Sequence, residues 1–487
     1  MAFSSILFLF CFLPVFLVVY LASPNRWRNL LAVVSSLAFY AWGAPLFVYV
    51  LVIGAGLDYW VSCQISKSRS YGADQPAVRE LCLRYLQLSL VVNVGLLLYF
   101  KYANFFVAQF DDLLALCGIE SIAWTSVVLP IGISFFTFHK ISYVVDVYWG
   151  RTAPARSFGD CLLYLLLFPQ LIAGPIIRYH DVDSQIRSRR LSVAQFWSGV
   201  ERFTLGLAKK VLIANAMAEL CDPIYKTQAA FVPTCYAWLA AVAYYFQIYF
   251  DFSGYSDMAI GLGRMMGFEF RENFERPYIA QTFTEFWRRW HISLSNFMRE
   301  YIYIPLGGNR CSPVRGYINL WIVFLLSGFW HGASWNFIVW GAFQGLFLTI
   351  DKLVWSKLSQ RVPKLLLRLS MVLLVMISWV IFRSDTMTQA KDLLLRMFFG
   401  GGPQWYEYWH TTNSRLDGQA LAMLAAAVVV SFAPWSAAYC AFEGWFLAWR
   451  KTSLGSFVMM IVVFLLLVVA SIRVVNSSYN PFIYFRF

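Results

Sequence analysis

Charged residues are scarce in this chain. Of its 487 residues, 39 are Lys or Arg and 26 are Asp or Glu, which is 13% and about half the share in an average soluble domain. Hydrophobic residues make up 60% of the chain and aromatic residues 19%. This composition excludes disordered, collagen-like and disulfide-scaffold proteins, and it is too apolar for a soluble protein of this size. We therefore expect an all-α protein that crosses the membrane many times and is surrounded by membrane lipid.

The motifs of several other protein classes are also missing. The nine cysteines form no C-x-x-C pair and most lie in apolar runs, so we predict neither a disulfide framework nor a metal site. There is no G-x-S-x-G elbow, no G-x-G-x-x-G fingerprint and no His followed by Asp at the spacing of soluble glycerolipid acyltransferases. The net charge is +13, and no basic soluble domain is present. We therefore expect the excess basic side chains to lie in cytoplasmic loops and against anionic lipid headgroups, and we expect no nucleic-acid partner.

What the sequence has instead is a series of apolar segments. A helix needs about 20 apolar residues to cross a bilayer. Ten to twelve crossings are predicted from the segments Phe3–Ala22, Trp27–Trp42, Ala44–Cys63, Cys82–Phe100, Ser126–Tyr148, Phe158–Ile177, Ala208–Leu220, Pro233–Phe252, Tyr317–Ile350, Leu365–Phe382, Ala420–Ala441 and Ser456–Ile472. Tyr317–Ile350 is long enough to be bent or doubled. Gly and Pro interrupt several of these segments, which is tolerated in a membrane only beside protein or a wet cavity, so we predict an internal cavity.

The positions of Lys and Arg predict the orientation. Residues 178–210 hold seven Lys or Arg against three acids, and residues 264–315 hold eight Arg against five acids, so both stretches should be cytoplasmic. The charges after the first and third segments place the N-terminus outside. A simple count of crossings does not keep both basic stretches inside, which indicates re-entrant segments, above all around residues 158–177. No internal repeat and no polar linker is visible, so we expect one domain over residues 1–487.

His331 is the ionisable residue that lies inside the apolar run 316–350, apart from Tyr317. Ionisable side chains at membrane depth are costly and are functional by default. On one helix, Ser327, Gly328, Ser334 and Trp335 would share its face, and the glycines would leave a groove for another backbone or a ligand. A neutral imidazole there can take a proton from a hydroxyl near physiological pH.

Two alternatives to a catalytic base stay open for this residue. The imidazole could simply form hydrogen bonds between two helices, as polar side chains do in membrane bundles. In the other alternative, Ser327 is the nucleophile and His331 its base, which is weaker because a helical serine usually bonds to its own i−4 carbonyl.

The segment Phe283–Tyr301, FTEFWRRWHISLSNFMREY, has the apolar period of an amphipathic helix. His291 falls at the edge of the apolar arc, while Arg288 and Arg289 lie on the wet face. This pattern predicts an interfacial helix, and simple anchoring would explain it. The alternative is that His291 and the arginines line a cytoplasmic cavity mouth, where guanidinium groups would bind an anionic acyl donor such as a coenzyme A phosphate.

Asp251 and Asp257 lie in the apolar segment YFQIYFDFSGYSDMAIGLGRMMGFEF. A carboxylate in such surroundings needs a partner. Orientation of a nearby Arg or hydroxyl group is the role that we expect, and a purely structural role is the alternative.

At these residues the sequence resembles the membrane-bound O-acyltransferase (MBOAT) family, and within it the membrane subunits for O-acetylation of alginate and related exopolysaccharides. The resemblance covers essentially the whole chain. It is carried above all by the motifs DFSGYSDMAIGLG (251–263), ENFERPY (272–278), EFWRRWHISLS (285–295), REYIYIPLGGNR (299–310) and GFWHGASWNFIVWGA (328–342).

The resemblance implies about 11 transmembrane helices, with re-entrant and interfacial helices, around a central tunnel. Donor would enter the tunnel from the cytoplasm and acceptor from the other side. His331 matches the family's intramembrane catalytic histidine and His291 the second, cytoplasm-side one. From the same motifs we predict that donor or substrate is bound by Trp287, Arg288, Arg289, Asp257 and Asn336.

These features together predict a membrane-embedded O-acetyltransferase of the bacterial inner membrane. Acetyl-CoA is the expected donor, no tightly bound cofactor is expected, and a periplasmic acetyltransferase partner would place the acetyl group on an alginate-like polysaccharide. The same relay could serve peptidoglycan, cellulose or teichoic acid. A transporter of an acylated substrate is the rival class, but transporters often have repeated halves, which are not seen here. A structural scaffold for polymer export is a third possibility, and it would leave a charged, broken-helix interior without purpose.

Overall fold

The computed structural model describes residues 2–401, 417–477 and 483, which form helices and contain no strand. Six helical stretches are long and apolar enough to cross a membrane. They are Phe47–Arg69, Pro76–Leu116, Trp335–Leu358, Lys364–Arg383, Gly418–Trp435 and Ser453–Asn476. Other predicted crossings coincide with shorter or more polar helices, including the apolar stretch Phe8–Ala22. The predicted all-helical, multi-pass class is therefore confirmed.

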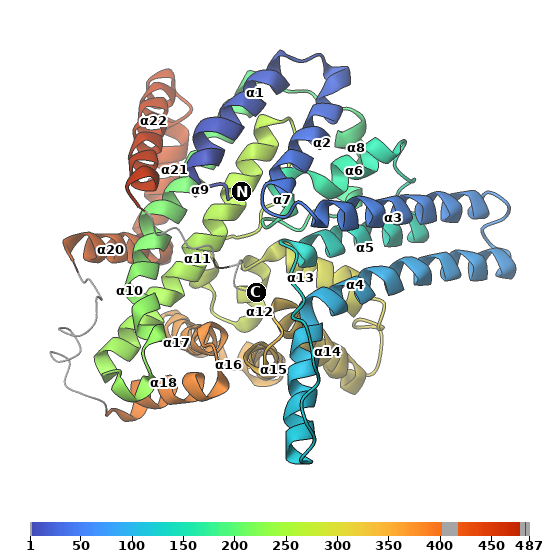
Figure 1. Cartoon of the computed structure of the whole chain (residues 1–487). Helices are drawn as coiled ribbons and strands as arrows, with labels where there is room; N and C mark the ends of the chain where they lie inside the picture. The colour runs from blue at the N-terminus through green and yellow to red at the C-terminus, as the bar shows by residue number, and fades with distance from the viewer. Residues whose placement is uncertain (1, 402–416, 478–482, 484–487) are drawn as a thin grey trace. The chain divides into compact units, whose positions relative to one another are not determined.

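The chain divides into two compact units, and the prediction of one domain over residues 1–487 stays a prediction. Unit 1 comprises Met1–Val200 and Ala259–Arg271. Its helices are η1 (Phe8–Phe12), α1 (Leu13–Ala22), α2 (Asn25–Ala41), α3 (Phe47–Arg69), α4 (Pro76–Leu116), α5 (Ile133–Trp149), α6 (Phe158–Leu166), α7 (Phe168–Leu171), α8 (Tyr179–Arg187) and the first half of α9 (Val193–Ala208) (Figure 1).

Unit 2 comprises Glu201–Met258 and Glu272–Phe487. Helix α11 (Thr234–Met265) continues from it into unit 1. The other elements are η2 (Lys209–Ala214), α10 (Asn215–Lys226), η3 (Ala229–Phe231), η4 (Pro277–Ile279), α12 (Phe283–Arg289), α13 (Ile292–Met298), η5 (Arg299–Tyr303), α14 (Pro313–His331), α15 (Trp335–Ile350), η6 (Asp351–Trp355), α16 (Ser356–Leu358), α17 (Lys364–Arg383), α18 (Met387–Phe399), α20 (Gly418–Phe432), η7 (Ala433–Trp435), α21 (Ala437–Trp449) and α22 (Ser453–Asn476).

A buried polar cluster links three helices of unit 1. Asp58 of α3 accepts hydrogen bonds from Ser89 Oγ at 2.6 Å and Asn93 Nδ2 at 2.9 Å, both in α4. Lys140 Nζ of α5 lies 3.3 Å from the other oxygen of Asp58. A buried carboxylate is tolerated when it is paired and hydrogen-bonded in this way. The cluster therefore fixes the register of α3, α4 and α5.

The predicted interruptions are present as helix breaks. Residues 158–177 form α6 and α7, of nine and four residues, and neither is long enough to cross a bilayer. The re-entrant segment around residues 158–177 stays a prediction. The run Tyr317–Ile350 is doubled, as its length allowed, because α14 ends at His331 and α15 begins at Trp335.

Glycines bring α14 and α15 into backbone contact. A Cβ added at Gly328 would lie 2.2 Å from the carbonyl oxygen of Phe337 and 3.1 Å from Cα of Gly341. A Cβ at Gly341 would lie 2.4 Å from the carbonyl oxygen of Phe324. The groove predicted at Gly328 is thus filled by the next helix and is not open to a ligand. Small residues allow this close approach.

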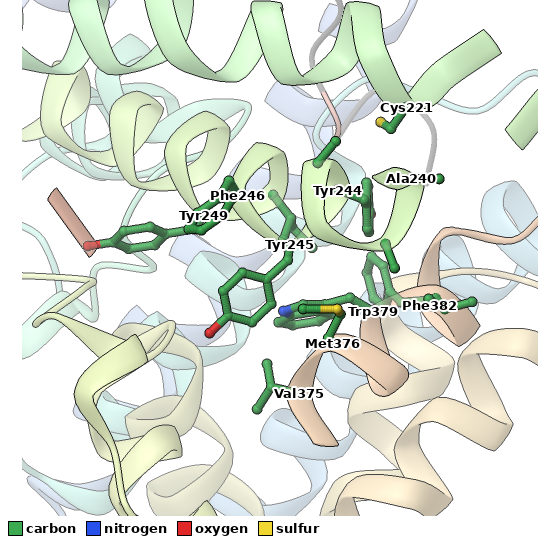
Figure 2. Packing of buried hydrophobic residues seen from close by; sticks show 14 of the residues in the cluster. Cys221, Ala240, Tyr244, Tyr245, Phe246, Tyr249, Val375, Met376, Trp379 and Phe382 are labelled. Atoms are coloured by element: carbon green, nitrogen blue, oxygen red, sulfur yellow. The ribbon is translucent and has the colours of Figure 1, made fainter. Parts of the chain in front are cut away.

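Aromatic side chains form much of the core of unit 2. Tyr244, Tyr245 and Tyr249 of α11 belong to the same buried cluster as Trp379 and Met376 of α17, and Tyr245 lies beside these two side chains (Figure 2). This core continues through Trp290, whose ring centroid lies 4.9 Å from that of Trp379. The loop between α12 and α13 is therefore anchored in the centre of the unit.

Candidate active site

His291 lies in a sharp break between α12 and α13. The predicted continuous helix over Phe283–Tyr301 is wrong at this point, because His291 has a left-handed backbone (φ 45°, ψ 52°). This conformation is uncommon for a residue with a side chain and costs of order 1–3 kcal/mol. The residue is also 1% exposed and so does not lie at the edge of a wet face.

Asn273 holds this strained segment in place. Its backbone carbonyl accepts a hydrogen bond from Ile292 N at 2.9 Å. Its Oδ1 lies 3.2 Å from His291 Nδ1 and accepts hydrogen bonds from Ser293 N at 3.2 Å and Ser293 Oγ at 2.8 Å. Its Nδ2 donates to Ser256 Oγ at 3.1 Å, and the backbone N–H of Ser293, which can only donate, fixes the amide orientation. Because an amide oxygen can only accept, Nδ1 of His291 carries the proton.

The ring of His291 is therefore held in its neutral form. Its Nε2 is buried and has no hydrogen-bond partner among the residues that the structure describes. His291 lies outside the six candidate membrane spans. Burial lowers its pKa to about 3, because the charged ring would lose its hydration. At neutral pH the available lone pair is on Nε2, which is the form that a general base requires.

His331 terminates α14 and is almost as deeply buried, with 6% of its surface exposed. Its ring meets the rings of Trp340 and Phe382 edge-on, at centroid distances of 5.0 and 5.1 Å. Because α14 ends here, Ser334 and Trp335 belong to the next turn and helix and do not share its helical face, contrary to the prediction. The ring of Trp330 lies near both histidines, 4.8 Å from the His331 ring and 6.3 Å from the His291 ring.

Both histidines line one small cavity, the histidine pocket. It leaves about 10 Å³ for the centre of a water-sized sphere, which is room for roughly one water molecule. Large apolar side chains form the rest of its lining: Ile248, Phe252, Trp287, Trp290, Trp340, Trp379, Phe382 and Ile483. The structure thus brings together two imidazoles that are 40 residues apart in the sequence.

Trp287 also lines a much larger cavity, the chamber. By the same measure its volume is about 500 Å³. Its lining includes Arg288, Arg299 and Lys352 and no acidic residue among those described. None of these three cations has a salt bridge to another described residue. The chamber therefore has a positive potential that favours an anionic ligand.

Comparison with known proteins identifies the family. Residues 155–384 match MBOAT, the membrane-bound O-acyltransferase family. A Pseudomonas aeruginosa protein named "Probable alginate O-acetylase AlgI" is 44% identical over 430 residues, covering 88% of this chain and 80% of that protein. A Pseudomonas putida protein of the same name is 41% identical over 504 aligned residues, covering 100% of both chains. This chain belongs to the MBOAT family. A Helicobacter pylori protein named "Peptidoglycan O-acetyltransferase" is 36% identical, covering 81% of this chain and 79% of that protein.

Membership confirms the resemblance seen in the motifs. The chain is a multi-pass membrane acyltransferase. The transporter and scaffold alternatives are thereby set aside. The roles assigned to individual site residues stay predictions, and the geometry separates them into three groups.

Trp287, Arg288 and the two histidines line the cavities. Trp287 lines both the histidine pocket and the chamber, and Arg288 lines the chamber. Arg289 lies apart, because it donates to Glu285 Oε1 at 3.0 Å and to the carbonyl of Glu275 at 3.2 Å. It belongs to the lining of neither cavity.

Asn336 has a structural contact. It lies in the first turn of α15, is 2% exposed, and donates from Nδ2 to the carbonyl of Ser384 at 2.6 Å. This bond links the start of α15 to the residue that follows α17. Asn336 does not line either cavity.

Asp257 has the cationic partners that a buried carboxylate requires. Arg202 Nη2 lies 2.7 Å from Oδ1 and Lys209 Nζ lies 2.6 Å from Oδ2, and Arg202 also pairs with Glu272. Asp251 pairs with Lys210 at 2.7 Å. A structural role for both carboxylates fits these contacts, and Asp257 lines neither cavity.

The sequence predicts no role for two residues of the site, Asn273 in the motif ENFERPY and Lys352 just beyond the apolar run. Arg299 lies on the polar face of the segment Phe283–Tyr301, with Arg288 and Arg289. Nothing in the local pattern shows that Arg299 and Lys352 face the same chamber.

Proposed function

We propose that this protein is an O-acetyltransferase of the bacterial inner membrane that takes acetyl groups from a cytoplasmic thioester and passes them across the membrane to a secreted polysaccharide of the alginate type. The main support is that His291 and His331 line one small pocket beside a large cationic chamber. The names of the Pseudomonas relatives supply the acetyl group and the polymer.

The chamber is suited to the donor. Acetyl-CoA carries several phosphate charges and a long, partly polar arm, and the chamber offers about 500 Å³ and the cations Arg288, Arg299 and Lys352. Guanidinium groups bind phosphate in a bidentate manner, and Lys acts as a point charge. With the phosphates held there, the thioester end would point past Trp287 toward the histidines.

The chemistry in the histidine pocket is general-base acyl transfer. The acceptor hydroxyl gives its proton to an imidazole, its oxygen bonds to the acetyl carbon, the carbon–sulfur bond breaks, and the thiolate takes up a proton. His331 is our choice for the base, and a transient acyl-imidazole on the same residue is the alternative. His291, held neutral with its proton on Nδ1 by Asn273, would orient the acceptor hydroxyl by accepting a hydrogen bond at Nε2.

A periplasmic acetyltransferase partner completes the relay. Each of the two compact units contains candidate membrane-spanning helices, so neither unit, as far as its residues are described, is a soluble domain that could hold a polymer. We therefore infer that the acetyl group passes to a partner that modifies the polysaccharide. Peptidoglycan is the second candidate acceptor, because the Helicobacter pylori relative is named for it.

The test uses membrane vesicles that contain this protein with its complete acetylation machinery, supplied with acetyl-labelled coenzyme A thioester. We expect label on the polymer with the wild type and a loss of about 10²–10⁴-fold with His331→Gln. Ser327→Ala separates the mechanisms, since only a serine nucleophile would lose transfer to the same extent. Normal labelling by a correctly folded His331→Gln protein would remove His331 from the chemistry.

A further inference from the structure

Trp287 is the one wall that the chamber and the histidine pocket have in common among the described residues. Arg288, the next residue, faces the chamber, whereas His291, four residues later, faces the pocket. Any group that passes from the chamber to the histidines must therefore pass the indole of Trp287. Because its side chain is 8% exposed, this indole has little freedom to move away.

The indole is fixed by contacts from two helices. Its Nε1 donates to Gln344 Oε1 of α15 at 3.3 Å, and Gln344 is itself 1% exposed. Its ring meets that of Phe324 of α14 at 5.3 Å and that of Trp340 of α15 at 5.9 Å. Without this hydrogen bond, the buried side-chain oxygen of Gln344 would lose its partner, so the observed orientation of the Trp287 indole is energetically favoured.

The space beyond Trp287 is very small. The histidine pocket has room for about one water-sized sphere, and six of its ten lining residues are Trp or Phe. Rigid aromatic walls do not yield as a flexible Met or Lys would. An acetyl group carries a single methyl beyond its carbonyl, and each further methylene would need volume that these walls do not leave.

We propose that Trp287 is the specificity-determining residue that restricts the transferred group to acetyl. This inference rests on the proposed function, because it takes the chamber as the thioester site and the pocket as the place of transfer. The bonds made and broken are the same for every acyl length, and only the volume required at the pocket differs. A tight apolar wall discriminates against one added methylene by about 10–200-fold.

The experiment measures how fast free coenzyme A is released from acetyl-, propionyl- and butyryl-CoA by membrane vesicles that contain the full chain with its acetylation machinery. Wild-type protein should prefer acetyl over propionyl by roughly 10-fold or more. In Trp287→Leu this preference should fall by at least about tenfold, and butyryl-CoA should become a substrate. Trp287→Phe, which keeps an aromatic ring and is the gentler change, should shift the ratio in the same direction by less.

Trp238→Leu is the matched control. Trp238 is another tryptophan whose Nε1 donates a hydrogen bond, to the carbonyl of Met397 at 2.7 Å, but it lines neither the chamber nor the histidine pocket. The change should leave the acetyl-to-propionyl ratio at its wild-type value.

The outcomes separate the two proposals. If the wild type releases coenzyme A from none of the thioesters, the proposed function is overturned. If the wild type is active and both Trp287 variants keep its acyl-length ratio, the role of Trp287 is overturned. Folded Trp287 variants that are inactive with every thioester would also overturn it, because Trp287 would then be needed for transfer and would not select length. Thermal unfolding of each purified variant establishes folding.

Discussion

Asn273 offers a direct test of how the site is held together. Its side chain is fully buried and takes part in four hydrogen bonds, three at Oδ1 and one at Nδ2. Asn273→Leu keeps the approximate shape but removes all four. At about 1 kcal/mol for each bond, we expect a loss of about 4 kcal/mol, reduced by whatever backbone strain at His291 is released. Because the His291 ring also loses its anchor, transfer should fall by roughly 100-fold in the protein that remains folded.

Asn273→Asp tests the charge state of the same ring. A carboxylate about 3 Å from Nδ1 stabilises the charged imidazole, so the pKa of His291 should rise from its burial-lowered value of about 3. A raised pKa means that the ring is protonated at higher pH than before. If transfer needs neutral His291, the acid limb of the pH–rate profile should move upward by roughly one to three pH units.

The assays are thermal unfolding in detergent and coenzyme A release between pH 4 and pH 8. Asn319→Leu is the control, because Asn319 is an equally buried amide that donates to the carbonyl of Leu306 at 3.1 Å and lines neither cavity. It should reduce stability and leave the acid limb unchanged. An Asn273→Asp profile that overlays the wild-type profile would refute the role given to His291 and its anchor.

Three further predictions concern other parts of unit 2. Asp257→Asn removes the counter-ion of Lys209 and one of the two counter-ions of Arg202, and it should lower the free energy of unfolding by about 2–3 kcal/mol, measured by denaturant titration. Gly328→Ala forces α14 and α15 apart and should lower stability by several kcal/mol, whereas Gly316→Ala, in open space on α14, should be neutral or stabilising by up to about 1 kcal/mol. Arg288→Gln should raise KM for acetyl-CoA about tenfold while Arg289→Gln leaves it unchanged, since Arg288 alone of the two lines the chamber; equal KM values would contradict the assignment.

The apolar pattern predicts the fold class well because membrane helices are specified by length and composition. The doubled run over Tyr317–Ile350 and the broken segment 158–177 follow from the same logic, since Gly and Pro positions are visible locally. The position of His331, alone in an apolar run, likewise marks it as a candidate functional residue. These features depend on neighbours within one or two helical turns.

The segment around His291 could not be predicted in this way. Its 3.6-residue period is that of a continuous helix, and the period persists through the break. What ends α12 is a set of hydrogen bonds to Asn273 and Glu275, 14 to 20 residues upstream. Periodicity carries no information about such contacts. Asp257 shows the opposite case. A carboxylate in apolar sequence suggests a binding role, but in the fold its charge is paired with Arg202 and Lys209.

The two cavities also explain why one small site can use a large donor. Interactions made far from the reacting carbon can hold the donor in the ground state and the transition state alike, and such contacts act mainly on KM. Interactions at the histidines change as the acyl bond is exchanged, and these act on kcat. Because Arg288 faces one cavity and His331 the other, their substitution should divide along this line, with Trp287 between them affecting the choice of acyl group. An arrangement in which a single cavity performed both tasks would predict that all three changes alter kcat and KM together.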